Sequence, residues 1–403
     1  MIPFSPPRID QKIIDEVSAA LKSGWITTGP RTKQFEKMIT AYCGHRATLC
    51  VNSGSSGLEL MLRWFGVGEG DEVIIPAYTY SATANVVVHC GAKPVMVDTG
   101  DDFNIDTGRI REAISPATKV IMPVDIAGWP CDYDAIHAIV EDEQVKRLFS
   151  PHSAEQEKLG RILVLADAAH SIGAESHGRK TGSLTDISVF SFHAVKNLST
   201  AEGGAICLNL PEAFDNEELY KYLCIKSLHG QTKDALAKAQ AGNWQYDVIE
   251  AGYKYNMTDI QAAMGIVELS RYDEDMQPRR KAIFDRYRQG FSQKAWALLP
   301  PYQNDEKISS CHIFLLRIKG INEQVRNEIM KRVFAREVSV NVHFIPLPML
   351  TFYKNAGYDI DDYPTSYKNY CRVISLPVYY DLSDAQTDTV ISAVVESVEE
   401  LLS

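Results

Sequence analysis

The sequence predicts an α/β fold in which a large domain with a mostly parallel central sheet precedes a smaller α+β domain. Two observations predict the sheet. Between about residues 50 and 210, short runs of Val, Ile and Leu end in turn or polar residues, and helical segments separate them. The second observation is that several of these runs are continuous rather than alternating. Continuous apolar runs are typical of strands covered on both faces, as in parallel sheets with helical crossovers. Length predicts the second domain, since 403 residues exceed the usual size of one.

The elements are expected in a definite order along the chain. Residues 10–22 have the spacing of an amphipathic helix. The expected strands are 72–76, 94–97, 119–123, 162–166, 187–192 and 204–208, with helices at 56–65, 81–90 and 133–141. A helical stretch at 258–293 precedes strands at 314–318 and 338–344 and helices at 323–336 and 383–402. We expect a large domain over 10–270, a small domain over 271–403, an N-terminal arm over 1–9, and a polar surface insertion at 144–160.

Composition and charge exclude several classes of protein. The net charge of −11 disfavours long-range attraction to nucleic acid or to an anionic membrane. No apolar run reaches the ~18 residues of a membrane span, and the first residues lack the basic and apolar regions of a signal peptide. The eight cysteines form no C-x-x-C pair, which favours reduced thiols over metal ligands or disulfides. We therefore expect a cytoplasmic protein without a metal site.

A loop of serine and glycine, Asn-Ser-Gly-Ser-Ser-Gly at 52–57, precedes one expected helix. Such a loop presents backbone N–H groups, hydroxyls and a favourable helix dipole to a phosphate group. Helix capping explains the same residues equally well. The loop alone therefore leaves both interpretations open.

Two charged residues follow buried strands. Asp167 ends an apolar run, at the edge of the sheet where α/β proteins bind ligands, although it could equally cap a helix. Lys196 follows another apolar run and precedes a Gly-Gly pair at 203–204. A lone lysine is usually a solvated surface charge, but a buried one has a lowered pKa and can bond covalently to an aldehyde.

Together, the three features suit pyridoxal 5′-phosphate (PLP). The cofactor needs an anion site for its phosphate, a carboxylate that keeps its pyridine nitrogen protonated, and a lysine that holds its aldehyde. Tyr80 follows an expected strand, where its ring could cover the cofactor, although core packing is the commoner role of an aromatic residue.

The ordered set of motifs closely resembles the DegT-type family of sugar-nucleotide aminotransferases, which are PLP enzymes of fold type I with an aspartate aminotransferase-like architecture. The resemblance covers nearly the whole chain. It rests on the serine loop, on Asp-Ala-Ala-His at 167–170 and on Ser-Phe-His-Ala-Val-Lys-Asn at 191–197. Ser-Gly-Trp-Ile-Thr-Thr-Gly-Pro at 23–30 and Gly-Tyr-Lys-Tyr-Asn-Met-Thr-Asp at 252–259 add to it.

The resemblance implies a role for each matching residue. Lys196 would hold the cofactor and then move a proton between cofactor and sugar carbons. Asp167 would pair with the pyridine nitrogen, and His170, where many members carry Gln, would hydrogen-bond the phenolic oxygen. Ser55, Ser56 and Ser191 would hold the phosphate, and Tyr80 would stack on the ring. Lys254, where many members have Asn, would reach the phosphate from the partner subunit of a homodimer with shared active sites. Substrate contacts would come from Trp25, Thr27, His193, His343 and Phe344.

The resemblance also implies a reaction. Glutamate would donate its amino group, and a nucleotide-linked keto sugar would accept it, for amino-sugar or cell-surface glycan biosynthesis. The segments 23–30, 191–194 and 252–256 look most like those of enzymes that make UDP-4-amino-4-deoxy-arabinose, which favours a UDP-4-keto sugar. The segments 128–133 and 144–160 depart from those enzymes.

Three alternatives stay open. The first is transfer to a 3-keto sugar. The second is a sugar dehydratase on the same fold, but those relatives replace the lysine with histidine, so Lys196 argues against it. The third is a non-catalytic regulatory protein, which the complete set of Lys196, Asp167 and serine loop disfavours.

Overall fold

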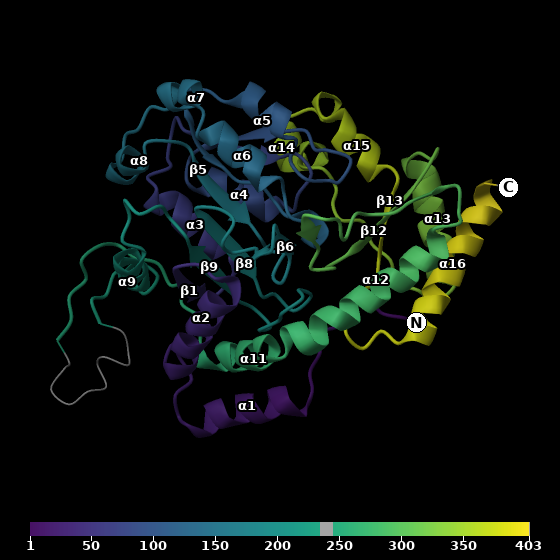
Figure 1. Ribbon diagram of the computed structural model, residues 1–403, viewed down its shortest axis with the longest axis horizontal. Helices are drawn as coiled ribbons and strands as arrows, with labels where there is room; N and C mark the ends of the chain where they lie inside the picture. Colours follow the sequence, from purple (N-terminus) through teal and green to yellow (C-terminus); the bar gives the residue numbers. More distant parts are fainter. Residues whose placement is uncertain (234–244, 403) are drawn as a thin grey trace.

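The computed structural model describes residues 1–233 and 245–402 (Figure 1). Its helices are α1 (Gln11–Lys22), α2 (Pro30–Cys43), α3 (Gly54–Trp64), α4 (Ser81–His89), α5 (Thr107–Ala113), α6 (Tyr133–Val140), α7 (Glu143–Leu148), α8 (Ala154–Leu159), α9 (Asn216–Lys226), α11 (Asp259–Ser270), α12 (Gln277–Phe291), α13 (Glu323–Ala335), α14 (Thr351–Asn355), α15 (Pro364–Tyr370) and α16 (Asp384–Leu402). A π-helical turn at Tyr272–Met276 joins α11 to α12. No helix in these ranges is long and apolar enough to cross a membrane.

The central sheet has the strand order β1-β9-β8-β5-β4-β2-β3. Neighbours from β8 to β3 pair in parallel, whereas β9 is antiparallel to both β1 and β8. The strands are β1 (Ala47–Val51), β2 (Glu72–Pro76), β3 (Lys93–Val97), β4 (Thr118–Ile121), β5 (Leu163–Asp167), β8 (Ile187–Ser191) and β9 (Gly204–Leu208). The prediction of an α/β fold with a mostly parallel sheet is therefore confirmed.

Alternation along the strands divides the sheet into two buried faces. In β9, Ile206 packs in one apolar cluster with α3, whereas Ala205 and Cys207 pack in another with α2 and α11. Successive side chains of a strand point to opposite faces, so a strand buried on both faces must be apolar throughout. This explains the continuous apolar runs that predicted the sheet.

The C-terminal part of the chain packs around its own apolar cluster. Strands β12 (Phe314–Ile318) and β13 (Val373–Leu376) pair antiparallel, and β10 (Ala297–Leu298) adds to the edge of β12. Helices α12, α13 and α16 cover these strands (Figure 1). The short strands β6 (Glu175–Ser176), β7 (Arg179–Lys180) and β11 (Lys307–Ile308) form a third sheet. The boundary between residues 270 and 271 falls where α11 ends, and it stays a prediction.

One local prediction was wrong. The strand expected at 338–344 does not form, because Val338 and Asn341 make only isolated bridges and the Asn341 side chain accepts from the Val342 N–H. A side-chain acceptor of this kind removes a donor from a strand ladder. The span 144–160 contains α7 and α8, and the buried Gln156 donates to the Phe65 carbonyl.

Candidate active site

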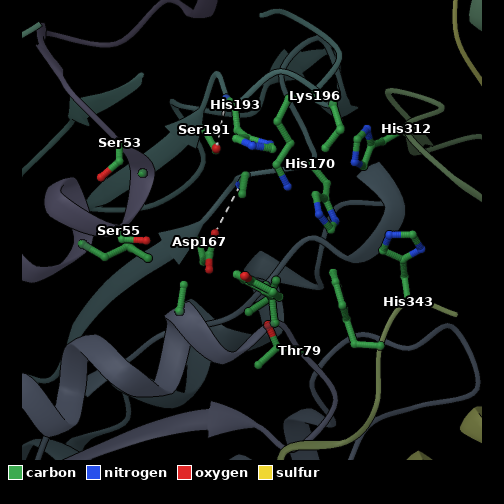
Figure 2. Close-up of a pocket in the computed structure, with 18 of the residues that line it drawn as sticks. Ser53, Ser55, Thr79, Asp167, His170, Ser191, His193, Lys196, His312 and His343 are labelled. Atoms are coloured by element: carbon green, nitrogen blue, oxygen red, sulfur yellow. Dashed lines mark hydrogen bonds between the residues drawn. The ribbon is translucent and has the colours of Figure 1, made fainter. Parts of the chain in front are cut away.

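The pocket lies at the carboxyl ends of parallel strands, where α/β sheets bind ligands. A cavity of about 350 Å³ opens there. Figure 2 shows Ser53 and Ser55 on one side, Lys196 and three histidines on the other, and Asp167 between them. The predicted residues that line it are Ser55, Tyr80, Asp167, His170, Ser191, His193, Lys196, His343 and Phe344.

The N-terminus of α3 forms the serine wall of this pocket. Ser53 is the N-cap, and its hydroxyl accepts from the Ser56 N–H at 3.1 Å. The Ser56 hydroxyl donates to Asn52 Oδ1 at 2.6 Å, and Ser56 is buried behind the wall rather than among the lining residues. Ser53, Ser55 and Ser191 do line the pocket. Ser53 thus both caps α3 and lines the pocket, whereas the Ser56 hydroxyl bonds within the loop. Ser53 was missing from the predicted set.

Gly204 allows β9 to approach this wall closely, which leads to a prediction. A Cβ at position 204 would lie 2.7 Å from Gly54 N and from Ser53 C, which are both backbone atoms. We expect Gly204→Ala to displace the start of α3 and to weaken PLP binding about tenfold or more, since overpacking typically costs 1–3 kcal/mol. Titration of cofactor-free protein with PLP measures this loss. Gly68→Ala is the matched control, because no atom lies within 4 Å of its added Cβ; equal affinities of the two variants would contradict the expectation.

Asp167 ends β5 and is buried, with a 7% exposed surface. Thr83 Oγ1 donates to its Oδ2 at 2.8 Å, and the Ala169 N–H donates to its Oδ1 at 3.2 Å. Burial raises the pKa of this carboxyl group, while the Thr83 hydrogen bond and the charge of Lys196 oppose the rise. A buried carboxylate of this kind is stabilised further by a cationic partner within the pocket.

Lys196 follows β8 in a turn in which its N–H donates to the His193 carbonyl at 2.8 Å. Its side chain is half-buried and points into the pocket (Figure 2). Burial lowers the pKa of its ammonium group to about 8, and the Asp167 charge opposes that fall. Far more of this side chain is therefore the free amine near neutral pH than for an exposed lysine, and the free amine is the nucleophilic form.

Three histidines form the wall opposite the serines. The His170 Nδ1 accepts from the Ala127 N–H at 3.3 Å, so the neutral ring carries its proton on Nε2. Burial lowers the pKa of His170 well below its usual value, and the nearby Lys196 and His343 lower it further. His312 stacks on His170 with ring centres 4.4 Å apart. Sequence reasoning missed His312; the polar run at 309–312 before the strand 314–318 was the available signal.

Neutral histidines in the pocket predict a pH dependence of stability. Burial lowers the pKa of His343 to about 4, whereas an unfolded histidine binds a proton below about 6.5. The unfolded state therefore binds more protons between pH 6.5 and 4, and the free energy of unfolding falls as the pH falls through that window. We expect the Tm of cofactor-free His343→Gln to fall less steeply there than that of the wild type. A His343→Gln protein with the slope of the wild type would contradict the assignment.

Trp25, Thr27 and Lys254 lie outside the lining of the pocket. The segments that carry them pack together, because the Asn256 amide donates to Thr28 Oγ1 at 2.7 Å and Trp25 Nε1 donates to the Thr28 carbonyl at 3.0 Å. The Lys254 ammonium group donates to Asn256 Oδ1. The structure thus brings these two distant motifs to one surface and does not bring them to the pocket of the same chain.

The arrangement fits the requirements of PLP. An amine with a lowered pKa, a buried carboxylate and a serine-lined helix N-terminus face one cavity from three sides. The amine matches the cofactor's aldehyde carbon, and the carboxylate matches its pyridine nitrogen. The serine-lined helix N-terminus matches its phosphate. Tyr80 is 61% exposed at the mouth, with its ring centre 5.7 Å from that of Phe344.

Comparison with known proteins agrees with this chemistry. Residues 7–395 match the DegT/DnrJ/EryC1/StrS aminotransferase family. The spore coat polysaccharide biosynthesis protein SpsC of Bacillus subtilis is 37% identical over 99% of this chain and 97% of its own length. Spr1654 of Streptococcus pneumoniae, provisionally assigned as a sugar aminotransferase, is 44% identical in its PMP form, with a TM-score of 0.95 and full coverage of both chains.

Two further structures extend the comparison. The PLP form of Spr1654 is 42% identical, with a TM-score of 0.94 and full coverage of both chains. The aminotransferase TlmJ of Streptoalloteichus hindustanus is 28% identical, with a TM-score of 0.85 and full coverage of both chains. The chain therefore belongs to the DegT/DnrJ/EryC1/StrS aminotransferase family, it has fold type I, and its cofactor is pyridoxal 5′-phosphate.

Proposed function

We propose that the protein moves an amino group from glutamate to a keto sugar carried on a nucleotide, most specifically a UDP-4-keto sugar, in the cytoplasm. The observation that carries the proposal is the presence of Lys196 and Asp167 in one cavity, with the start of α3 opposite. The motifs at 23–30, 191–194 and 252–256 support a UDP-linked substrate. The names of SpsC and Spr1654 support sugar chemistry in this branch of the family.

In this proposal the residues of the chain bind, orient and move protons. When bound, PLP supplies an electron sink that stabilises negative charge on the substrate carbon. Lys196 holds the cofactor between turnovers, and its freed amine takes a proton from glutamate and later returns one to the sugar carbon. Asp167 keeps the pyridine nitrogen protonated. His170 donates a hydrogen bond to the phenolic oxygen of the cofactor. The donor is Nε2, the nitrogen that carries the proton in the neutral ring.

Other residues of the pocket bind the cofactor and the substrate. Ser55 and Ser191, together with Ser53, bind the cofactor phosphate, and Ser56 holds the loop behind them. Tyr80 covers the ring, and His193, His343 and Phe344 contact the substrate from the pocket wall.

We also propose that the active form is a homodimer with shared active sites. Trp25, Thr27 and Lys254 lie on segments that pack against each other, outside the lining of their own pocket. Lys254 would then reach the cofactor phosphate of the partner protomer, and Trp25 and Thr27 would contact its sugar substrate. A local positive charge is needed there, because the substrate diphosphate is anionic and the chain as a whole carries −11.

The experiment is an amino-transfer assay with purified protein, PLP and glutamate against a panel of UDP-, dTDP- and GDP-linked 3-keto and 4-keto sugars. We expect an amino sugar and 2-oxoglutarate from a UDP-4-keto substrate. Conversion of dTDP-linked substrates alone would overturn the UDP preference, and conversion of 3-keto sugars alone would overturn the 4-keto assignment. A deoxy product that forms without glutamate would identify a dehydratase instead.

A further inference from the structure

A segment of the C-terminal part of the chain, residues 309–313, contributes His312 and Ile313 to the wall of the pocket. It precedes β12 and docks on the large sheet through backbone bonds: the Ser310 N–H donates to the Gly128 carbonyl at 3.0 Å, and the His312 N–H donates to the Ala127 carbonyl at 3.1 Å. The approach is so close that a Cβ at Gly128 would lie 2.0 Å from Ser310 Oγ. The 309–313 segment is thus held in one position relative to the sheet.

The side chain of Asn197, the neighbour of Lys196, is fixed by this segment. Its Nδ2 donates to the Ser310 carbonyl at 2.8 Å and to the Tyr272 hydroxyl at 3.2 Å, and its Oδ1 lies 2.7 Å from His312 Nδ1. A carbonyl oxygen only accepts, so the amide nitrogen must face Ser310 and the amide oxygen must face His312. His312 Nδ1 is therefore a donor. Both N–H groups of the Asn197 amide therefore donate to residues outside the 191–197 turn.

The 309–313 segment also holds His170. Ser310 Oγ donates to the His170 carbonyl at 2.6 Å, and the His312 ring packs on the His170 ring. The charged and titratable groups that face His312 are His170, Lys196, Arg280 and His343, and together with burial they lower its pKa well below the usual value. His312 is therefore a neutral ring whose donor is Nδ1.

Arg280 on α12 supports the same segment from behind. It is buried, and its Nη1 donates to the carbonyls of Cys311, His312 and Val378 at 3.4, 3.3 and 3.1 Å. Its contacts are thus carbonyl groups that fix the backbone of 311–312. The chain of contacts runs from α12 through His312 and Asn197 to the residue next to Lys196.

We propose that His312 is a positioning residue for Lys196, and that it acts through the side chain of Asn197. The hydrogen bond from His312 Nδ1 to Asn197 Oδ1 fixes the end of the 191–197 turn, so the C-terminal part of the chain sets where the Lys196 amine lies. The inference rests on the proposed role of Lys196.

Two substitutions at position 312 separate the ring from the hydrogen bond. His312→Phe keeps a ring against His170 but loses the donor, whereas His312→Asn loses the ring but keeps a donor near the position of Nδ1. A misplacement of about 1 Å at a reacting group can cost about 10²-fold. In the half-reaction with glutamate and bound PLP, we expect His312→Phe to lower kcat roughly 10- to 100-fold, with KM changed less than about threefold. His312→Asn should stay within a few-fold of the wild type.

Two readouts do not depend on turnover. The pH midpoint of the visible absorbance change of the bound cofactor reports the environment of Lys196, and it should shift in His312→Phe but not in His312→Asn. Crystal structures of the cofactor-free variants should show Lys196 displaced in His312→Phe alone. His45→Asn, at a buried histidine bonded to Thr48 in the α2–β1 region, is the matched control and should keep the absorbance midpoint even if its Tm falls.

A double-mutant cycle tests the route through Asn197. Asn197→Leu removes the bond to His312 together with the bonds to Ser310 and Tyr272, so it should lose at least as much as His312→Phe. The double variant should lose no more than Asn197→Leu alone, because the His312 bond is already absent there. Independent losses that multiply, or a His312→Phe protein with wild-type absorbance midpoint and kcat, would overturn the proposal. If His312→Phe does not fold, Asn197→Leu and His312→Asn still decide between the outcomes. A wild-type protein without the glutamate half-reaction would instead overturn the proposed function.

Discussion

Alanine at position 196 is expected to abolish amino transfer. Lys196 is the amine that faces Asp167 in the pocket, and burial lowers its pKa to about 8. In the proposed mechanism, the substitution removes both the group that holds the cofactor and the group that moves the proton. General acid–base catalysis alone contributes about 10²–10⁴-fold, so we expect kcat/KM to fall by at least about 10⁴-fold. The measurement is single-turnover conversion of glutamate to 2-oxoglutarate, with the visible spectrum of the bound cofactor.

Lys221→Ala is the matched control for that experiment. Lys221 is an exposed residue of α9 that pairs with Glu218 at 2.7 Å, outside the pocket. It should keep wild-type kcat/KM and spectrum. A Lys196→Ala protein that still transaminates and still shows the absorbance of the covalently held cofactor would disprove the role of Lys196.

The second large effect is expected from Asp167→Asn, which keeps the shape of the side chain and removes its charge. The Thr83 hydroxyl can rotate to bond the new amide, so we expect little change in folding. In the proposed mechanism, the variant loses the negative charge that stabilises the protonated pyridine nitrogen of the cofactor. We expect kcat to fall roughly 10²–10⁴-fold, the span that a positioned acid or base contributes, with a smaller change in KM. Steady-state kinetics with glutamate measures both.

Asp305→Asn serves as the control, since Asp305 is exposed and lies outside the pocket. It makes the same chemical change and should leave kcat unaltered. An Asp167→Asn enzyme with the kcat of the control would show that the pyridine nitrogen is not paired with this carboxylate. A lower Tm with unchanged kcat would assign Asp167 to folding alone.

The sequence predicted the sheet well where both faces of a strand are buried. Glu72–Pro76 and Gly204–Leu208 were predicted with their observed bounds, because burial on both sides requires apolar residues throughout. The strand Ala47–Val51 was not predicted, because a short run containing Ala, Thr and Cys has no distinctive periodicity. Its place in the sheet depends on pairing with β9, about 160 residues later, which local patterns do not encode.

The part of the candidate site that lies at the ends of strands was predicted from the sequence. Asp167 ends β5 and Lys196 follows β8, and the parallel pairing of these strands brings their ends to one edge of the sheet. His312 could not be predicted as part of the site, because it lies in the segment before β12, a strand of another sheet. Ser53 and Ser56 could not be told apart either, because side-chain direction at a helix start decides which serine lines the cavity and which is buried behind it.

The route of the chain through the pocket has a consequence for how the enzyme matures in the cell. Its wall is built from Ser53 near the beginning and from His343 and Phe344 near the end, and β1 pairs with a strand made much later. Synthesis proceeds from the N-terminus at about 5–20 residues per second. A nascent chain released before residue 344 has left the ribosome would lack a complete wall, so PLP capture is a late event in biogenesis, and truncated chains are not expected to retain the cofactor.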